Sequence, residues 1–226
     1  LEGSKSFTKD ICKKYNIPTA TYETFSNAKD ALIYIDNHST PLVIKVDGLA
    51  AGKGVIIAET KDHAINSVNE IFSGKFGNAG DEIVIEEFLD GEEASFFIIS
   101  DGESFLPLTS AQDHKRIGDG DIGLNTGGMG AYSPAPIMNK DIEEKTINKI
   151  IKPTIRAMKD YGSPYIGILY AGLMIKDNEP KLIEYNVRFG DPECQVIIPR
   201  LENDLVELLV NVKEKNLDSY TLKWKE

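Results

Sequence analysis

Hydrophobic and polar residues along the chain follow two periods. Apolar positions three or four residues apart predict amphipathic helices, and short apolar runs bounded by glycine, proline or asparagine predict strands. The helical pattern covers residues 6–15, 28–36, 62–72, 141–160 and 202–215. The strand pattern covers residues 42–46, 55–58, 83–87, 94–100, 104–108, 165–175 and 181–187. This order predicts an α+β fold, with Pro153 expected to kink or split the fourth helix.

The order of elements also predicts two units. Residues 1–90 combine short helices with a strand–loop–strand hairpin, and residues 74–80 are expected to form a mobile loop. Longer strands follow from residue 91 onward, up to about residue 217. Within this second unit, residues 112–130 contain six glycines and little apolar sequence. A connection of that length is usually functional or disordered.

The charge balance narrows the choice of partners. The chain carries 25 Lys and Arg against 36 Asp and Glu, a net charge of −11. Nucleic acid and anionic membranes are therefore not expected as partners, and a bound phosphate needs a local cationic pocket. The apolar runs are shorter than the roughly 18 residues of a membrane span. Cys12 and Cys194 form no CxxC motif, so a reducing cytoplasm is the expected location.

Residues 47–54 (DGLAAGKG) are similar to a phosphate-binding P-loop but differ from it at two positions. Asp47 replaces the first glycine, and Gly54 stands where a P-loop has the hydroxyl that holds magnesium. The segment also lies between two predicted strands instead of opening a helix. A flexible hairpin that closes over phosphates, with Lys45 and Lys53 beside it, is the favoured interpretation, and a plain glycine-rich turn is the alternative.

Two glycine motifs lie in the long loop. Residues 118–123 match GxGxxG by letters only, because no strand precedes them, no helix follows and two aspartates would repel a pyrophosphate. Residues 126–130 (TGGMG) are different, since consecutive glycines let backbone N–H groups approach an anion closely. A tight turn into the next strand explains the same residues equally well.

The last predicted strand leads into a polar segment. Alternation places Glu184, Asn186 and Arg188 on one face, where two oxygen ligands suit Mg²⁺ and a guanidinium suits a phosphate or carboxylate. Asp191 and Glu193 add carboxylates in the turn that follows. The alternative is a solvated strand face with an ion pair.

A second charged segment offers weaker support. Residues 113–116 (DHKR) can hold a phosphate through Lys115 and Arg116, although such charge runs are usually solvated. No HExxH, GxSxG or Cys/His pair supports a metalloprotease or a serine or cysteine hydrolase.

Six segments in chain order resemble the phosphoribosylamine–glycine ligase (glycinamide ribonucleotide synthetase) family of the ATP-grasp superfamily. They are residues 4–9 (SKSFTK), 43–55 (VIKVDGLAAGKGV), 85–95 (IEEFLDGEEAS), 112–116 (QDHKR), 125–134 (NTGGMGAYSP) and 184–193 (EYNVRFGDPE). The resemblance implies that two α+β subdomains hold ATP between two antiparallel sheets. Residues 1–90 would be the small lid subdomain with an entry helix, residues 91–217 the large subdomain, and residues 218–226 the start of a missing C-terminal domain.

The resemblance also implies roles for single residues. The residues that it places at ATP are Lys5, Lys45, Gly52, Lys53, Gly54, Glu86, Phe88, Leu89 and Glu93. The lysines would contact the phosphates, and residues 47–54 would form a lid over them. Glu86 to Leu89 would contact the adenine, and Glu93 would contact the ribose. It makes Glu184 and Asn186 ligands of Mg²⁺ or Mn²⁺. The glycine and amine sites would be lined by Asp113, Lys115, Arg116, Asn125, Thr126, Gly127, Gly128, Arg188 and Asp191. Lys45, Arg188 and Asp191 would take part in catalysis, Arg188 by facing the transferred phosphoryl group.

The implied reaction joins glycine to 5-phosphoribosylamine through glycyl phosphate, with ADP and phosphate as further products, in purine biosynthesis. Two departures from the family pattern matter. Related enzymes often place a further acidic metal ligand in the preceding strand, but residues 170–173 (YAGL) contain none, so the number of metal ions stays open. The resemblance also implies an N-terminal domain that helps bind the amine, and we expect that domain to lie outside these 226 residues. The alternatives are therefore an ATP-binding core that does not turn over alone, or a sibling ATP-grasp ligase that uses another acid or amine.

Overall fold

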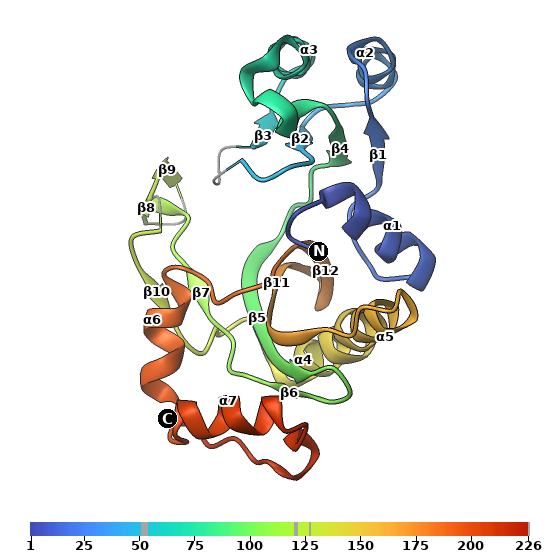
Figure 1. Ribbon diagram of the computed structural model, residues 1–226. Helices are drawn as coiled ribbons and strands as arrows, with labels where there is room; N and C mark the ends of the chain where they lie inside the picture. The colour runs from blue at the N-terminus through green and yellow to red at the C-terminus, as the bar shows by residue number, and fades with distance from the viewer. Residues whose placement is uncertain (51–53, 120–121, 127, 226) are drawn as a thin grey trace. The chain divides into compact units, whose positions relative to one another are not determined.

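The computed structural model describes residues 1–50, 54–119, 122–126 and 128–225 of the chain (Figure 1). The chain divides into two compact units. Unit 1 comprises Leu1–Lys14 and Thr19–Asp90, and unit 2 comprises Tyr15–Pro18 and Gly91–Glu226. The short segment at 15–18 belongs to unit 2 because the Leu182 N–H donates a hydrogen bond to the Pro18 carbonyl (2.8 Å).

Unit 1 is a four-stranded antiparallel sheet with helices. Its elements are α1 (Lys5–Tyr15), β1 (Tyr22–Phe25), α2 (Ala28–Asp36), β2 (Leu42–Val46), β3 (Val55–Ala58), α3 (Lys61–Glu70), a π-helical turn (Ile71–Lys75), a 3₁₀ turn (Gly77–Gly80) and β4 (Ile83–Glu87). The strand order is β1-β4-β2-β3, and β2 and β3 form the predicted hairpin. Helices α2 and α3 lie side by side against the sheet (Figure 1). They begin at Asn27 and Thr60, whose side chains accept hydrogen bonds from the first-turn N–H groups.

Unit 2 is built on a second four-stranded antiparallel sheet. Its elements are β5 (Glu92–Asp101), β6 (Phe105–Pro107), β7 (Gln112–Asp113), β8 (Arg116–Gly118), β9 (Ile122–Asn125), β10 (Ala131–Tyr132), α4 (Lys140–Thr146), a π-helical turn (Ile147–Ile151), α5 (Lys152–Asp160), β11 (Ile166–Lys176), β12 (Glu179–Asn186), α6 (Glu193–Ile197), a 3₁₀ turn (Ile198–Arg200), α7 (Leu205–Lys213) and a 3₁₀ turn (Leu217–Ser219). The strand order is β12-β11-β5-β6. Phe97 and Ile99 of β5 pack against Leu208 and Val212 of α7, and Trp224 packs on the same core cluster.

Two predicted loops are wrong. Residues 74–80, expected as a mobile loop, contain a kink at Gly74 (φ +101°) at the end of the π-helical turn, followed by the 3₁₀ turn. Residues 112–130, expected as one long connection, contribute to two short antiparallel ribbons, β7 with β10 and β8 with β9. Backbone pairing satisfies the N–H and C=O groups of these strands, which are only two to four residues long. Hydrophobic periodicity did not predict them because so few positions define no period.

Other boundaries differ by a few residues. The helix predicted over residues 202–215 begins only at Leu205, because the Asp204 carboxylate caps it through the Glu207 N–H. The predicted split near Pro153 is confirmed as the π-helical turn that precedes it, since proline interrupts the regular helical hydrogen bonds. No helix in the described part of the chain has the length and apolar character needed to cross a membrane.

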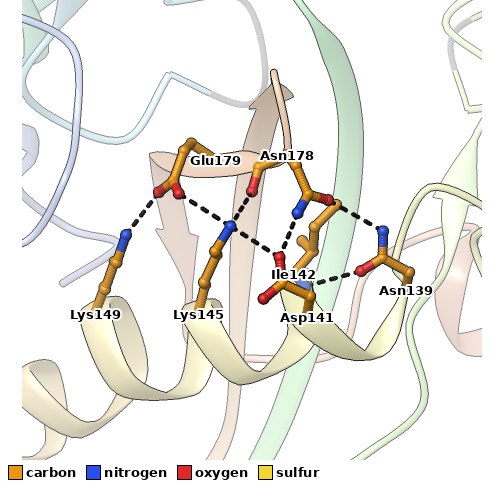
Figure 2. Close-up of polar contacts among 7 residues, drawn as sticks. All are labelled: Asn139, Asp141, Ile142, Lys145, Lys149, Asn178 and Glu179. Carbon is orange, nitrogen blue, oxygen red and sulfur yellow. Dashed lines mark hydrogen bonds and ion pairs between the residues drawn. The ribbon is translucent and has the colours of Figure 1, made fainter.

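An ion-pair network joins α4 to the turn between β11 and β12 (Figure 2). The Lys145 ammonium lies 2.8 Å from Asp141 and 3.0 Å from Glu179, and donates to the Asn178 carbonyl (2.9 Å). Lys149 lies 2.6 Å from the second Glu179 oxygen. These contacts hold the end of the hairpin and help to fix its register. A one-residue slip would turn every side chain of β12 to the opposite face.

Candidate functional site

Asp47 and Gly48, at the start of the predicted lid (residues 47–54), are hydrogen-bonded to the start of α1. The Ser6 N–H donates to Asp47 Oδ1 (2.6 Å), as does the Ser4 hydroxyl (3.2 Å), so the carboxylate satisfies donors at the helix N-terminus. The Lys5 ammonium donates to the Gly48 carbonyl (3.4 Å). The structure thus brings Lys5 to the base of the predicted lid, which spacing along the sequence alone did not show.

A buried carboxylate in the same unit connects two lysines. Glu86 Oε1 lies 3.0 Å from the Lys45 ammonium, and Oε2 lies 3.1 Å from the Lys9 ammonium. All three side chains are about 3–4% exposed. Strand pairing of β2 with β4 places Lys45 beside Glu86, while α1 supplies Lys9. The Glu86 side chain is therefore engaged with lysines, a contact that the expected role at the adenine did not include.

Phe88 and Leu89, two residues predicted to contact the adenine, follow directly after β4. Phe88 is exposed and Leu89 is partly exposed, as a surface that receives a ligand requires. At the other end of the predicted lid, the Val46 N–H donates to the Gly54 carbonyl (2.9 Å). A Cβ at Gly54 would lie 2.5 Å from a Val46 methyl, so this close approach requires glycine. The predicted lid residues Gly52 and Lys53 lie outside the described residues.

In unit 2, the end of β12 brings together three predicted residues. Glu184 and Asn186 lie two positions apart on β12, opposite Gly172 and Tyr170 of β11. Arg188 lies beyond the strand, which ends at Asn186, so the predicted alternation does not extend to it. Its guanidinium nevertheless donates to Asn186 Oδ1 (3.3 Å) and to the Phe189 carbonyl (2.9 Å).

The oxygen donors at this strand end suit a hard divalent cation. Mg²⁺ binds through one or two protein oxygens and completes its shell with water and substrate phosphates. The carboxylate of Glu184 and the amide oxygen of Asn186 meet that requirement, and both side chains are partly exposed. No cluster of three or more His, Cys, Asp and Glu side chains suited to a metal occurs within the described ranges. The donor set therefore fits a metal ion that is coordinated partly by these protein oxygens and partly by the oxygens of a bound phosphate. It does not fit a site in which the protein supplies every ligand.

The ribbon β7–β10 positions the charged segment at 113–116. The Lys115 ammonium lies 3.0 Å from Glu93 and 3.1 Å from Asp113. Burial alone would lower the pKa of Lys115, but the two carboxylates outweigh it and raise that pKa above the ordinary lysine value. The expected phosphate contact of Lys115 is therefore not what the geometry favours, since its first partners are protein carboxylates. The side chain of Arg116 lies outside the described part of the molecule.

The glycine-rich part of this loop lies against the turn after β12. A Cβ at Gly128 would be 3.5 Å from the Asp191 carbonyl oxygen, and Gly128 has a φ of +88°. The Gly128 N–H donates to the Thr126 hydroxyl (3.3 Å), which itself donates to the His114 carbonyl. Thr126, Gly128 and Asp191 are thus neighbours, as the predicted substrate site requires. The predicted residue Gly127 and the Asn125 side chain lie outside the described residues.

Sequence reasoning missed two sets of residues. Lys9 was overlooked, although it lies on the buried face of α1 with Thr8 and Cys12, and a lysine on such a face is an available signal. Ser95 and Tyr170 were also not assigned to the site, and Glu193, expected as a further carboxylate in the turn after β12, is buried. Tyr170 and Ser95 place their hydroxyls 2.9 Å and 3.1 Å from Glu193 Oε1, whose side chain is buried at the start of α6. No local pattern joins these three residues, because they come from β5, β11 and α6.

Comparison with known proteins identifies relatives over the whole chain. The family model of the phosphoribosylglycinamide synthetase ATP-grasp (A) domain matches residues 3–194. A phosphoribosylamine–glycine ligase of Brucella melitensis is 57% identical over 226 residues, which are 100% of this chain and 53% of that protein. A chloroplastic phosphoribosylamine–glycine ligase of Arabidopsis thaliana is 55% identical and covers 99% of this chain and 43% of its own length. The chain thus spans about half the length of these relatives.

Solved structures support the same grouping. The crystal structure of phosphoribosylamine–glycine ligase from Thermotoga maritima superposes with a TM-score of 0.87 at 38% identity, over 95% of this chain and 55% of that one. A biotin carboxylase from Campylobacter jejuni has a TM-score of 0.73 at 16% identity, over 99% of this chain and 47% of that one, a likeness that shows the fold alone. The predicted α+β ATP-grasp fold is confirmed. The chain belongs to the phosphoribosylglycinamide synthetase ATP-grasp family.

Proposed function

We propose that this chain is the ATP-binding and catalytic core of an ATP-dependent ligase that joins glycine to 5-phosphoribosylamine and yields glycinamide ribonucleotide, ADP and phosphate. The family match and the printed names of the relatives support the reaction. The observation that carries the catalytic part is the strand end in unit 2, where Glu184 and Asn186 lie beside Arg188.

The nucleotide contacts are proposed for each unit by itself. In unit 1, Lys5 and Lys45 contact the phosphates, residues 47–54 close over them, and the Glu86–Leu89 segment contacts the adenine. In unit 2, Glu93 accepts hydrogen bonds from the ribose hydroxyls, although it is paired with Lys115 in this structure. Removing ammonium groups from water strengthens their interaction with phosphate, so the burial of Lys45 supports its role.

The proposed chemistry needs no protein nucleophile. A carboxylate oxygen of glycine attacks the γ-phosphorus of ATP, ADP leaves, and glycyl phosphate forms. The amine of 5-phosphoribosylamine then attacks the acyl carbon, phosphate leaves, and the amine proton passes to solvent or phosphate. Arg188 stabilises the charge on the transferred phosphoryl group, and a divalent cation held by Glu184 and Asn186 would neutralise phosphate charge.

The substrate sites are assigned to unit 2. The neighbouring residues Thr126, Gly128 and Asp191 are proposed to bind glycine or the amine, together with Asp113 and the undescribed groups of the same loop. Backbone N–H groups near Gly128 can approach a carboxylate or phosphate closely because no Cβ intervenes. Closure of the lid would exclude water from the acyl phosphate.

Calorimetric titration with MgATP, then glycine, then a stable phosphoribosylamine analogue tests each subsite in turn. Lys45→Ala should weaken MgATP binding by roughly 1.5–3 kcal/mol, the value of a hydrogen bond to a charged group. The control is Lys61→Ala, at an exposed lysine of unit 1. Unchanged affinity in folded Lys45→Ala would remove Lys45 from the phosphate site.

The metal assignment has its own test. Glu184→Gln keeps the shape of the side chain and removes its charge, so tight ATP binding should require a higher Mg²⁺ concentration. Glu144→Gln, at an exposed glutamate of α4, is the matched control. The same Mg²⁺ dependence in both variants would exclude Glu184 as a ligand. Repeating the titration with Mn²⁺ shows whether the site discriminates between the two ions.

One alternative is supported by a specific observation. The chain spans about half the length of its relatives, and the alternative is an ATP-binding core that does not complete the reaction alone. Glycine-dependent ADP release from this chain would exclude that alternative. Replacing glycine or the amine by other acids and amines separates the proposed reaction from that of a sibling ligase. We also propose a cytoplasmic location, which the two free cysteines support.

A further inference from the structure

The buried ion cluster of unit 1 contains two cations and one anion. Lys9 and Lys45 each contact a different oxygen of Glu86, at 3.1 Å and 3.0 Å. The three groups together carry one more positive than negative charge. Among these three groups positive charge exceeds negative charge, and in a buried setting this raises the electrostatic attraction of the Lys45 ammonium for an anion.

Lys9 itself is enclosed by protein. Its ammonium donates to the Thr19 hydroxyl (2.7 Å) and lies 5.3 Å from the centre of the Tyr22 ring, while the Tyr22 hydroxyl donates to the Lys9 carbonyl (3.0 Å). The residue is 3% exposed. Burial lowers the pKa of Lys9, and the Glu86 carboxylate offsets part of that effect. With its contacts made inside unit 1, Lys9 is suited to act on Glu86 and not on a ligand directly.

We propose that Lys9 is a positioning residue of the phosphate site, which holds Glu86 and offsets its charge so that Lys45 presents positive charge to the nucleotide phosphates. This inference rests on the proposed function, because it needs a nucleotide at Lys45. Without Lys9, the full charge of Glu86 would act on Lys45 alone. The pair would then be neutral, and its attraction for an anion would be weaker.

The test separates charge from structure by comparing nucleotides that differ only in phosphate. Lys9→Met preserves the length and apolar stem of the side chain. Binding of ATP, ADP and adenosine is measured calorimetrically, with displacement titrations for the weaker ligands. ATP affinity should fall on the order of tenfold, ADP affinity should fall less, and adenosine affinity should be nearly unchanged, because the lost interaction is with phosphate charge. Lys13→Met, at an exposed lysine of the same helix, should alter none of the three affinities.

A second variant keeps the test decisive if Lys9→Met does not fold. Lys9→Met/Glu86→Gln removes one charge of each sign and leaves Lys45 with the net charge of the original cluster. The glutamine amide oxygen can still accept a hydrogen bond from Lys45, so the buried ammonium keeps a polar partner in this variant. The ratio of ATP to adenosine affinity should return to that of the unaltered chain, whatever happens to the adenosine affinity itself.

The outcomes distinguish the two proposals. Equal losses of ATP and adenosine affinity in Lys9→Met, or a double variant that still lacks phosphate selectivity, would overturn the role of Lys9 while leaving nucleotide binding intact. Failure of the unaltered, folded chain to bind ATP would overturn the proposed function, and the inference about Lys9 with it.

Discussion

Tyr170→Phe tests whether the buried Glu193 carboxylate anchors the turn that carries Arg188 and Asp191. The Tyr170 hydroxyl donates to Glu193 Oε1 at 2.9 Å. The Ser95 hydroxyl lies 2.8 Å from the Tyr170 oxygen and 3.1 Å from Glu193 Oε1, so its single hydrogen can serve either acceptor. Because Glu193 opens α6, these contacts attach the end of the turn to the two central strands of the sheet.

The expected magnitude follows from the kind of bond removed. Tyr170→Phe deletes a donor to a buried carboxylate, and such a hydrogen bond contributes about 1.5–3 kcal/mol. The Ser95 hydroxyl can turn fully to Glu193 in the variant, which places the expected loss of unfolding free energy in the lower half of that range. Ser95→Ala should cost a similar amount, and the double variant should cost less than the sum, because the two hydroxyls share one acceptor.

Ionisation gives a second signature of the same contact. Burial and the Glu193 carboxylate raise the pKa of Tyr170 above its ordinary value of 10.0. A raised pKa in the folded state means that the unfolded state loses its proton first as the pH increases. The stability of unit 2 should therefore fall as the pH rises above 10.0, and Tyr170→Phe should show a smaller fall.

The assay is urea unfolding followed by tryptophan fluorescence. Trp224 is the one tryptophan of the chain and packs on the core of unit 2, so its signal reports that unit. Tyr15→Phe is the matched control, because the Tyr15 hydroxyl also donates to a carboxylate, Asp160, at 2.9 Å but at an exposed site. It should change stability little. A Tyr170→Phe midpoint equal to that of the unaltered chain, at unchanged slope, would refute the anchoring role.

Two further predictions use the same assay. Gly190→Ala should lower the unfolding free energy by about 1–3 kcal/mol, because the new Cβ would lie 2.1 Å from Glu193 Oε2. The carboxylate cannot easily move away, since the Tyr170 and Ser95 hydroxyls hold it. An unchanged midpoint of urea unfolding would show that Glu193 can move freely. In the network of Figure 2, hydrogen bonds with lysines lower the pKa of Asp141 and of Glu179 from 3.8 and 4.5. Their contribution should be complete above pH 4.5 and disappear as the pH falls through the lowered values. Lys145→Met should remove most of the Asp141 contribution and leave the part of the Glu179 contribution that depends on Lys149. An identical acid dependence in Lys145→Met would contradict the assignment.

The regular elements were predictable because their causes are local. The strands at 42–46, 55–58 and 83–87 and the helix at 28–36 have the predicted bounds, since apolar period and adjacent turn residues define them. The ribbons within residues 112–132 were not predictable in the same way. Their strands are two to four residues long, which is too short for an alternating pattern to predict them.

The candidate site shows the same division. Motif resemblance selected Lys45, Glu184, Asn186 and Arg188, and the structure brings the last three together. It could not select Lys9, whose neighbours in the sequence give no sign of a carboxylate partner.

The sequence by itself determined the α+β class, most helices and strands and the family, because apolar period, capping residues and short motifs are written along a few consecutive positions. Only the tertiary structure decided which charged side chains are in contact. Glu86 contacts Lys9 only because α1 packs beside β4, and Glu193 meets Tyr170 only through the packing of α6 on the sheet. Contacts between residues far apart in the chain depend on strand register and helix packing, and both are set by the burial of the whole core.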